Sequence, residues 1–341
     1  MQPQRVYATP PTPTAPLASI SRLPMRAEEG FDTAHVRWAL FASLALAALL
    51  MARAELTIEL GTLSNIPYAA AALAVLALRK RWIGRTLRHA EAVRDCAGYY
   101  AIFAATALVG AVSSYPIAAL SHGYADAALA RSDAALGFDW VGWYRVVADH
   151  RILQLLGIAA YQSIYLTPAV LLGWFARSGQ RREAHRFLAS FWVAAVLTLA
   201  LFALMPAVGP FSYLWHTPIR YMPSSELWQP DLIPALRAHA VRAIDLGQLR
   251  GLVSAPSFHA AAGAIYLRTA WRAGPVRWPL VWVVGAMLLA TPVEGTHYLT
   301  DMILGVAVAV AAMALVDALL ALARAPRGDL PLAEVHPISR G

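Results

Sequence analysis

Long runs of hydrophobic residues, separated by short polar or basic stretches, dominate the chain from residue 36 onward. Most of these runs hold roughly 17 to 25 apolar residues with few or no charges, enough to cross about 30 Å of hydrocarbon. Backbone groups inside a bilayer must satisfy one another, so the runs predict helices rather than strands. Eight candidate spans result, of which the second and sixth are shortest: 36–54, 63–78, 97–120, 153–176, 187–205, 257–269, 276–293 and 299–323.

The composition agrees with a membrane protein. Hydrophobic residues make up 59% of the chain, charged residues 14%, and the mean hydropathy is +0.51, which is too apolar for an ordinary soluble domain. We therefore predict an all-α, polytopic integral membrane bundle of about eight transmembrane helices. The net charge of +8 does not indicate a nucleic-acid partner, because the arginines gather in every second loop, as the positive-inside rule expects. This distribution predicts a multi-pass protein of the plasma (inner) membrane with both termini cytoplasmic.

Four segments are expected along the chain. Residues 1–30 are rich in proline, with TPPTPTAP among them, and predict a disordered cytoplasmic tail without a signal peptide. Residues 31–95 hold two N-terminal transmembrane helices, residues 96–324 hold six more, and residues 325–341 form a second cytoplasmic tail. Cys96 is the only cysteine, which excludes an intramolecular disulfide and a cysteine metal cluster.

Two outward loops, 121–152 and 206–255, are long enough to carry function. Aromatic and polar residues alternate in DWVGWY and SYLW, as is typical of segments at a membrane interface. In the second loop the apolar positions fit one face of a helix, which predicts an amphipathic lid over 206–255. A plain surface helix is the alternative. The positions are Leu232, Leu236, Ile244 and Leu249.

Two histidines stand at the heads of apolar runs, in APSFHAAAG and EGTHYLTD. His259 and His297 are 38 residues apart, which corresponds to about 57 Å of helix rise, or two membrane crossings. We therefore expect both at the outer surface. The helices that begin there present their N-termini, and paired N-termini make a natural anion site. Ser257 has the chemistry of an N-cap, and Gly295 lets backbone approach closely.

His297 and Asp301 are four residues apart, which places them on one face of a helix. The carboxylate can hold one imidazole nitrogen as N–H and leave the other free as a base or nucleophile. His259 is then the expected proton donor to a leaving oxygen. Two histidines and an aspartate could also ligate zinc, but Ser257 and Gly295 favour an anion, and we expect no metal and no cofactor. The plainer alternative is a set of interfacial polar residues.

At these positions the sequence resembles a known family. PSFH at 256–259 and GTHYLTDMILG at 295–305 are similar to the second and third signature motifs of the type 2 phosphatidic acid phosphatase superfamily, whose enzymes form a phosphohistidine intermediate. The HYxxD form looks closest to the branch that contains inositol phosphorylceramide synthase. FDW at 138–140 and PAVGP at 206–210 are softer matches.

The resemblance implies a fold and roles for individual residues. The six helices of 96–324 would form a phosphatidic acid phosphatase-like catalytic core. His297 would be the nucleophile, Asp301 its orienting partner and His259 the general acid, while Ser257 and nearby backbone N–H groups would hold the phosphoryl oxygens.

The sequence also departs from the family pattern. Where the phosphatases usually carry a Ser-Arg pair before the nucleophile, this chain has Ala290 and Thr291, and the lysine-containing first motif is absent. A phosphodiester carries one charge and needs fewer cations than a phosphomonoester, so the losses favour a diester substrate. Arg250, seven residues before Ser257, is the expected replacement cation, with Arg220 and Arg242 as alternatives.

The expected function is therefore a lipid phosphotransferase that passes a phospholipid headgroup to a lipid alcohol, as in sphingolipid metabolism. One alternative is a lipid phosphate phosphatase that acts on phosphatidic acid or a polyprenyl (di)phosphate. Another, of a different class, is a non-catalytic lipid-binding membrane protein. Water exclusion separates transfer from hydrolysis, and the aromatic lid favours exclusion.

Overall fold

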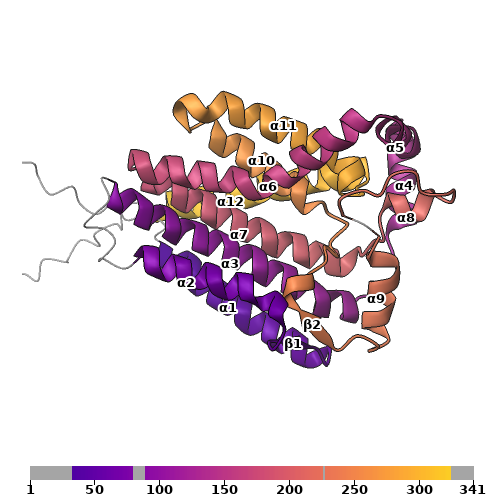
Figure 1. Ribbon diagram of the computed structural model, residues 1–341, viewed down its shortest axis with the longest axis horizontal. Helices are drawn as coiled ribbons and strands as arrows, with labels where there is room; N and C mark the ends of the chain where they lie inside the picture. Colours follow the sequence, from indigo (N-terminus) through magenta and orange to yellow (C-terminus); the bar gives the residue numbers. More distant parts are fainter. Residues whose placement is uncertain (1–32, 80–88, 226, 324–341) are drawn as a thin grey trace, which may run out of the picture.

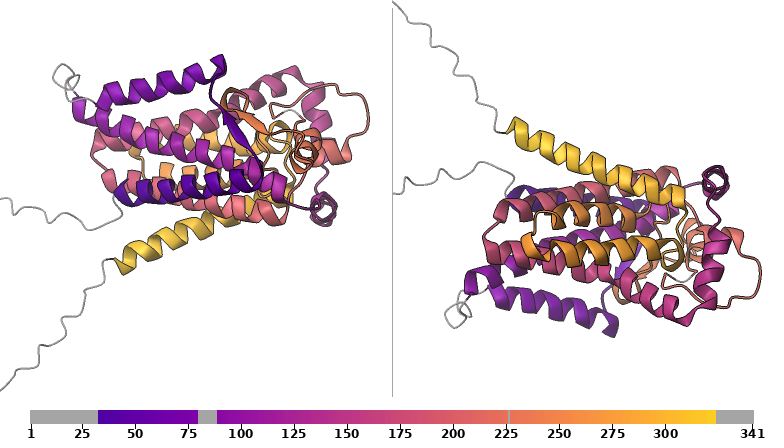
Figure 2. Two further views of the ribbon diagram at one scale, coloured as in Figure 1. Left: turned by 90° about the horizontal axis from the view of Figure 1, so that it is seen from below. Right: turned by 90° about the horizontal axis from the view of Figure 1, so that it is seen from above.

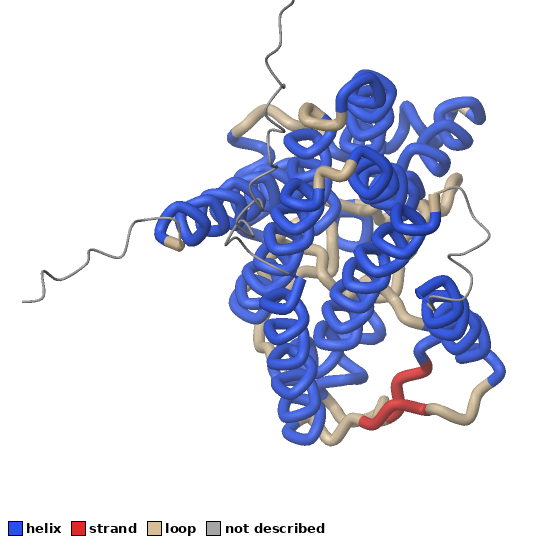
Figure 3. The backbone as a smooth tube through the Cα atoms, turned by 90° about the vertical axis from the view of Figure 1, so that its left-hand side faces the viewer, coloured by secondary structure: helices blue, strands red, loops and turns tan. Residues whose placement is uncertain are grey.

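The computed structural model describes residues 33–79, 89–225 and 227–323, and this part of the chain is mostly helical, with very little strand (Figures 1 and 3). The predicted tails and the basic residues at 80–88 lie outside the described residues. Within them, six helices are long and apolar enough to cross a membrane, which confirms the predicted all-α bundle. They are α1 (Thr33–Arg53), α3 (Ala90–Leu120), α6 (Arg151–Ser178), α7 (Arg181–Leu204), α11 (Arg277–Glu294) with the turn before it, and α12 (Leu299–Leu322).

The other two predicted spans are short helices. α2 (Ile66–Arg79) has 14 residues and α10 (Phe258–Ala270) has 13, so each rises only about 20 Å and falls short of a hydrocarbon core of about 30 Å. Six helices thus meet the length of a full crossing, while the two shortest predicted spans, the second and the sixth, are the shorter helices α2 and α10. α10 packs against α7, α11 and α12, so that protein rather than lipid surrounds most of it.

Small residues allow α10 to lie at the centre of the bundle. Ala260, Ala261 and Ala262 are fully buried in its first turns, and α12 crosses beside them. A Cβ atom on Gly305 of α12 would lie 2.2 Å from the carbonyl oxygen of Ser257, a separation that no side chain tolerates. Glycine at this position therefore brings the start of α12 against the start of α10, the two places where the histidine motifs lie.

The end of the bundle at which α12 begins carries four short helices and a small sheet (Figure 1). The helices are α4 (Asp126–Ala135), α5 (Trp140–Asp149), α8 (Pro210–Leu214) and α9 (Gln229–Arg237). The strands β1 (Thr57–Glu59) and β2 (Ala243–Asp245) pair in parallel. Because β1 belongs to the N-terminal helix pair and β2 to the 206–255 loop, the sheet joins that loop to α1 and α2. The described residues also include single 3-10 turns: η1 (Leu63–Asn65), η3 (Leu246–Gln248) and η4 (Gly274–Val276).

The lid does not form the single amphipathic helix that its apolar spacing predicts. α9 ends at Arg237, and His239 has a φ of 53°, a left-handed conformation that ends a helix. Ile244 then lies in strand β2. The apolar side chains that suggested one helix face nevertheless pack in one cluster: Leu232, Leu236, Ile244 and Leu249. Residues 206–255, the predicted lid, therefore form a folded loop whose apolar side chains share one cluster.

Ion pairs tie the helices together at the opposite end. Asp317 of α12 pairs with Arg186 of α7 and with Arg268 of α10, while Arg272 lies 2.8 Å from Glu183. α12 runs at an angle to the other helices toward this end (Figure 2), and Leu320 near its end is still buried in the core. These ion pairs join α7, α10 and α12 at the end of the bundle opposite the histidine motifs.

Candidate active site

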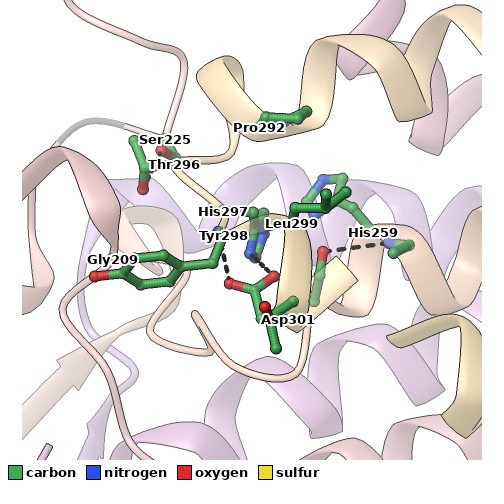
Figure 4. Close-up of polar contacts among 12 residues, drawn as sticks. Gly209, Ser225, His259, Pro292, Thr296, His297, Tyr298, Leu299 and Asp301 are labelled. Carbon is green, nitrogen blue, oxygen red and sulfur yellow. Dashed lines mark hydrogen bonds and ion pairs between the residues drawn. The ribbon is translucent and has the colours of Figure 1, made fainter. Parts of the chain in front are cut away.

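His297 lies in the connection between α11 and α12, and its Nδ1 atom is 3.1 Å from Oδ1 of Asp301 (Figure 4). His297 is 3% exposed and Asp301 is fully buried. The contact is made differently from the predicted pairing on a helix face, because α12 begins only at Leu299. Asp301 is at the third helical position, where its Oδ2 accepts the backbone N–H of the N-cap residue Tyr298 at 2.9 Å. One carboxylate therefore caps the helix and faces the imidazole.

This arrangement distinguishes the two ring nitrogens of His297. Nδ1 of His297 and Oδ1 of Asp301 are buried and form no hydrogen bond with other described residues or, at the present ring angle, with each other, but they lie 3.1 Å apart, so the carboxylate is the acceptor nearest to Nδ1. A carboxylate accepts hydrogen bonds and favours Nδ1–H. Nε2 is then left with its lone pair, which is the state that a nucleophile or general base requires.

His259 lies in the first turn of α10, and the centre of its ring is 6.2 Å from that of His297. Tyr161 of α6 stacks on His259 with ring centres 4.2 Å apart, and its hydroxyl is 3.4 Å from Nδ1. One face of the His259 ring and its Nδ1 atom thus contact Tyr161, which leaves Nε2 for another partner. The structure brings the two histidines together, as the two-crossing argument expects.

Ser257 caps α10, as its position behind Pro256 suggests. Its hydroxyl accepts the N–H of Ala260 at 3.3 Å, and its own N–H donates to the backbone carbonyl of Asp301 at 3.1 Å. The residue is fully buried. The motif that carries His259 is therefore bonded directly to the motif that carries His297.

The backbone that leads into His297 is tightly constrained. A Cβ atom on Gly295 would lie 2.6 Å from Cδ2 of His297, 2.9 Å from the carbonyl oxygen of Thr291 and 3.1 Å from Cε2 of Tyr161, so glycine is needed for this close approach. Thr296 has a φ of 49°, a strained conformation for a β-branched residue that costs about 1 to 3 kcal/mol. Such strain persists only where surrounding contacts hold the chain in place, and it occurs here directly before the candidate nucleophile.

Contrary to the prediction of paired anion-binding helix ends, a protein carboxylate occupies the start of α12. Asp133 of α4 accepts the N–H of Leu299 at 2.9 Å and both the N–H and the hydroxyl of Thr300 at 2.8 and 2.6 Å. Asp301 takes the N–H of Tyr298. These donors are satisfied within the protein, so the prediction that both helix ends receive the substrate anion is wrong for α12.

A second carboxylate of α4 holds the neighbouring chain. Asp126 accepts the N–H groups of Val208 and Gly209, each at 3.0 Å, and the hydroxyl of Tyr298, also at 3.0 Å. Figure 4 shows Tyr298 reaching from the start of α12 toward Gly209. Burial, and then the charge of Asp126, raise the pKa of the Tyr298 phenol, so it stays protonated as a donor. The PAVGP motif thus forms part of the support of the candidate site.

The FDW motif supports the same connection from α5. Asp139 caps this helix by accepting the N–H of Gly142 at 2.9 Å. The buried indole of Trp140 then donates to the backbone carbonyl of Pro292 at 2.8 Å. Both of the softer sequence matches therefore end in contacts with the chain around His297.

Glu294 is a further buried carboxylate that the sequence analysis did not single out. It is 1% exposed and accepts the hydroxyl of Tyr221 at 2.6 Å together with the N–H and hydroxyl of Ser224 at 3.0 and 2.6 Å. Burial, and then the bond to Glu294, raise the pKa of Tyr221, which keeps this donor protonated. The bonds fasten lid residues 221–225 to the end of α11.

Sequence signals for these carboxylates exist. Glu294 is an acidic residue that directly follows an apolar run, where a charge is costly unless it has a purpose. Asp126 and Asp133 are seven residues apart in DAALARSDAA, a spacing that puts both on one face of a helix. The contact of Tyr161 with His259, by contrast, follows only from the three-dimensional packing of α6 against α10.

The structure places the predicted cation Arg250 in the lid. Its guanidinium lies 3.7 Å from the ring centre of Trp228, and its backbone N–H donates to the hydroxyl of Tyr115 at 2.8 Å. The alternatives are paired with carboxylates, Arg220 with Asp149 at 2.7 Å and Arg242 with Glu55 at 3.4 Å. These contacts do not include the histidines, so a phosphate-binding role for Arg250 stays a prediction.

A family model described as the PAP2 superfamily matches residues 127–315, over half of the chain. The chain belongs to the PAP2 superfamily. The matched range contains both histidines, Asp301 and Asp133, while α1 and α2 lie outside it. No curated protein and no solved structure matches the chain. Membership supports a function of the lipid phosphatase or phosphotransferase type. Among the described residues, no three His, Cys, Asp or Glu side chains are grouped so as to hold a metal ion.

Proposed function

We propose that this PAP2 superfamily protein is a membrane lipid phosphotransferase that acts on a phospholipid headgroup through a phosphohistidine at His297. The observation that carries the proposal is the pairing of the buried His297 with Asp301 at 3.1 Å, beside a second histidine ring 6.2 Å away. A carboxylate, an oriented imidazole and a proton donor are the groups that nucleophilic phosphoryl transfer by histidine needs.

In the first half of the reaction, Nε2 of His297 attacks the phosphorus atom of the phospholipid. An N–P bond forms while the P–O bond to the diacylglycerol part breaks, and His259 gives its proton to the departing oxygen. Asp301 stabilises the positive charge that the imidazole of His297 acquires. The headgroup phosphate is then held on His297.

In the second half, the hydroxyl of an acceptor lipid loses its proton to His259 and its oxygen attacks the phosphorus atom. The N–P bond breaks, which restores His297 and leaves the headgroup phosphate on the acceptor. If water takes the place of the lipid hydroxyl, the same steps release the headgroup phosphate into solution, and with a phosphomonoester such as phosphatidic acid as substrate they release inorganic phosphate, as in a phosphatase. The identity of the acceptor therefore depends on which hydroxyl reaches the intermediate.

Two observations favour a lipid acceptor over water. His297 is only 3% exposed, and Glu294 fastens the lid to the chain that carries it through Tyr221 and Ser224. A site closed in this way limits the access of water to the intermediate. The absence of the Ser-Arg pair, where Ala290 and Thr291 stand instead, suits a phosphodiester with a single charge. We propose a reaction similar to that of inositol phosphorylceramide synthase.

The proposal is tested with the purified full-length protein in lipid vesicles. Headgroup-labelled phosphatidylinositol is offered with ceramide or diacylglycerol, and phosphatidic acid is offered in a parallel reaction. We expect label to appear on the acceptor lipid, and this product to vanish in His297→Ala and in His259→Ala. Acid-labile label on the protein in the absence of acceptor would identify the phosphohistidine.

Two other results would point elsewhere. Free phosphate from phosphatidic acid without lipid transfer would make the protein a phosphatase. Turnover that survives His297→Ala would remove the phosphohistidine mechanism, and lipid binding without any turnover would favour the non-catalytic alternative.

A further inference from the structure

Two buried carboxylates of the short helix α4, which lies outside the signature motifs, accept hydrogen bonds from the residues that follow the candidate nucleophile. Asp126 and Asp133 of α4 are 2% and 4% exposed. We propose that they are positioning residues, which hold the His297 loop in the geometry that directs Nε2 toward the substrate. The inference rests on the proposed function for its catalytic meaning, but the loop geometry itself can be measured without any reaction.

Asp133 acts on the residues that follow His297. It accepts three hydrogen bonds, two of them from the backbone N–H groups of Leu299 and Thr300 at 2.9 and 2.8 Å. These are the first two residues of α12. Their position fixes where the helix begins, and with it the distance from His297 to Asp301, since Asp301 is only one residue further.

Asp126 acts through a side chain. Its Oδ1 atom accepts the hydroxyl of Tyr298, the residue next to His297, and the N–H of Gly209, both at 3.0 Å. Tyr298 is fully buried. Its backbone N–H is bonded to Asp301 and its hydroxyl to Asp126, so both ends of the residue are held. The two aspartates thus hold three successive residues after the nucleophile.

The cost of burying two carboxylates indicates that these hydrogen bonds have a role beyond satisfying nearby donors. A buried carboxylate is costly to desolvate unless several donors compensate it, and neither aspartate has an ion-pair partner among the described residues. Each instead receives three charge-assisted hydrogen bonds, which are the strong class. The strained φ of 49° at Thr296 needs such restraint, since a loosely held chain would relax it and turn the His297 ring.

The test measures how readily His297 reacts with diethyl pyrocarbonate, using the intact protein in lipid vesicles and quantifying each histidine by mass spectrometry. The exposed His216 serves as an internal reference. We expect Asp133→Asn and Asp126→Asn to raise the labelling of His297 relative to His216 by roughly five- to thirty-fold, the factor that 1 to 2 kcal/mol of lost restraint produces. Tyr298→Phe, which removes only the hydroxyl bonded to Asp126, should raise it to a smaller extent.

Two controls separate positioning from general loss of stability. Asp149→Asn changes an exposed aspartate at the end of α5 in the same loop, paired among the described residues only with the exposed Arg220, and should leave the labelling unchanged. Leu172→Ala removes a fully buried side chain of α6 and should lower the unfolding temperature without a selective effect on His297.

Activity supplies the second measurement. In the vesicle transfer assay, the two Asp→Asn variants should lower kcat while KM stays within about twofold, because they change the orientation of His297 and not the surface that binds the lipid. Unchanged labelling and unchanged kcat, or labelling no greater than that of Leu172→Ala at a matched unfolding temperature, would overturn the inference. If His297→Ala retains full activity, the proposed function fails while the labelling comparison still decides whether α4 positions the loop.

Discussion

An isosteric substitution of Asp301 tests whether its carboxylate orients the His297 ring. Asp301→Asn keeps the shape of the side chain, but its amide can donate a hydrogen bond to Nδ1 and so favour the tautomer with hydrogen on Nε2. We expect kcat for lipid transfer to fall roughly 10³- to 10⁴-fold, as for other histidines that lose an orienting carboxylate. Initial rates over a range of phospholipid concentrations measure the change, and KM should remain close to that of the natural protein.

The matched control lies on the same helix. Asp317 of α12 pairs with Arg186 and Arg268 at the other end of the bundle. Asp317→Asn should lower the unfolding temperature, because two arginines lose their partner, and should leave kcat largely intact. Equal losses of kcat in both variants would show that Asp301 acts on the fold and not on the imidazole.

At the scale of elements, the contact between α10 and α12 decides whether the two motifs meet. Gly305→Ala would place a methyl group 2.2 Å from the carbonyl oxygen of Ser257, which forces the helices apart and costs about 1 to 3 kcal/mol. We expect a lower unfolding temperature together with a loss of transfer activity. Gly285→Ala on α11, where no atom lies within 4 Å of the new methyl group, should change neither. Normal activity in Gly305→Ala would mean that this contact is not needed to align the histidines.

The lid provides a second prediction at this scale. Glu294→Gln keeps the size of the side chain but removes its charge. The three bonds from Tyr221 and Ser224 become weaker, and the amide NH2 faces a donor from which it cannot accept a hydrogen bond. The lid should open more often, and hydrolysis of the intermediate should rise relative to lipid transfer by roughly fivefold or more, the factor for about 1 kcal/mol. The ratio of water-derived to lipid-derived product measures it.

The comparison variant for the lid is Asp149→Asn. Asp149 pairs with Arg220 in the same lid segment, but both side chains are well exposed, and exposed pairs contribute little. This variant should retain the natural product ratio. A Glu294→Gln protein with an unchanged ratio would show that the lid contacts do not control access of water.

The elements differ in how far their sequence predicts them. Hydropathy placed the ends of the spanning helices within a few residues, because lipid imposes both their length and their composition, but α3 and α7 begin seven and six residues earlier than predicted, in polar turns that hydropathy does not mark. The spacing of Leu232, Leu236 and Ile244 predicted a common apolar face, which exists, but not the strand pairing of β1 with β2 across the sequence. The contact of Asp133 with the start of α12 was equally inaccessible, because it depends on which loop folds over which helix.

The candidate site shows the same division. Motif spacing brought His259, His297 and Asp301 together because a membrane fixes where successive helices start. It did not reveal that His297 precedes α12, since a difference of two residues in a helix start leaves the sequence pattern unchanged. Nor did it reveal Tyr161, whose stacking on His259 follows from the packing of α6 against α10.

For the whole molecule, the remaining question is which side of the membrane each end faces. The positive-inside rule predicts that the histidine end is outside, because the short loops at the other end carry the arginine clusters. In a Cys96→Ser background, Thr217→Cys marks the histidine end and Ser178→Cys marks the end of α6 at the other side; both positions are exposed. A membrane-impermeant maleimide should label Thr217→Cys in intact cells and Ser178→Cys only after the membrane is opened. The reverse pattern would place the phosphoryl chemistry on the cytoplasmic side, where the acceptor would have to come from the inner leaflet.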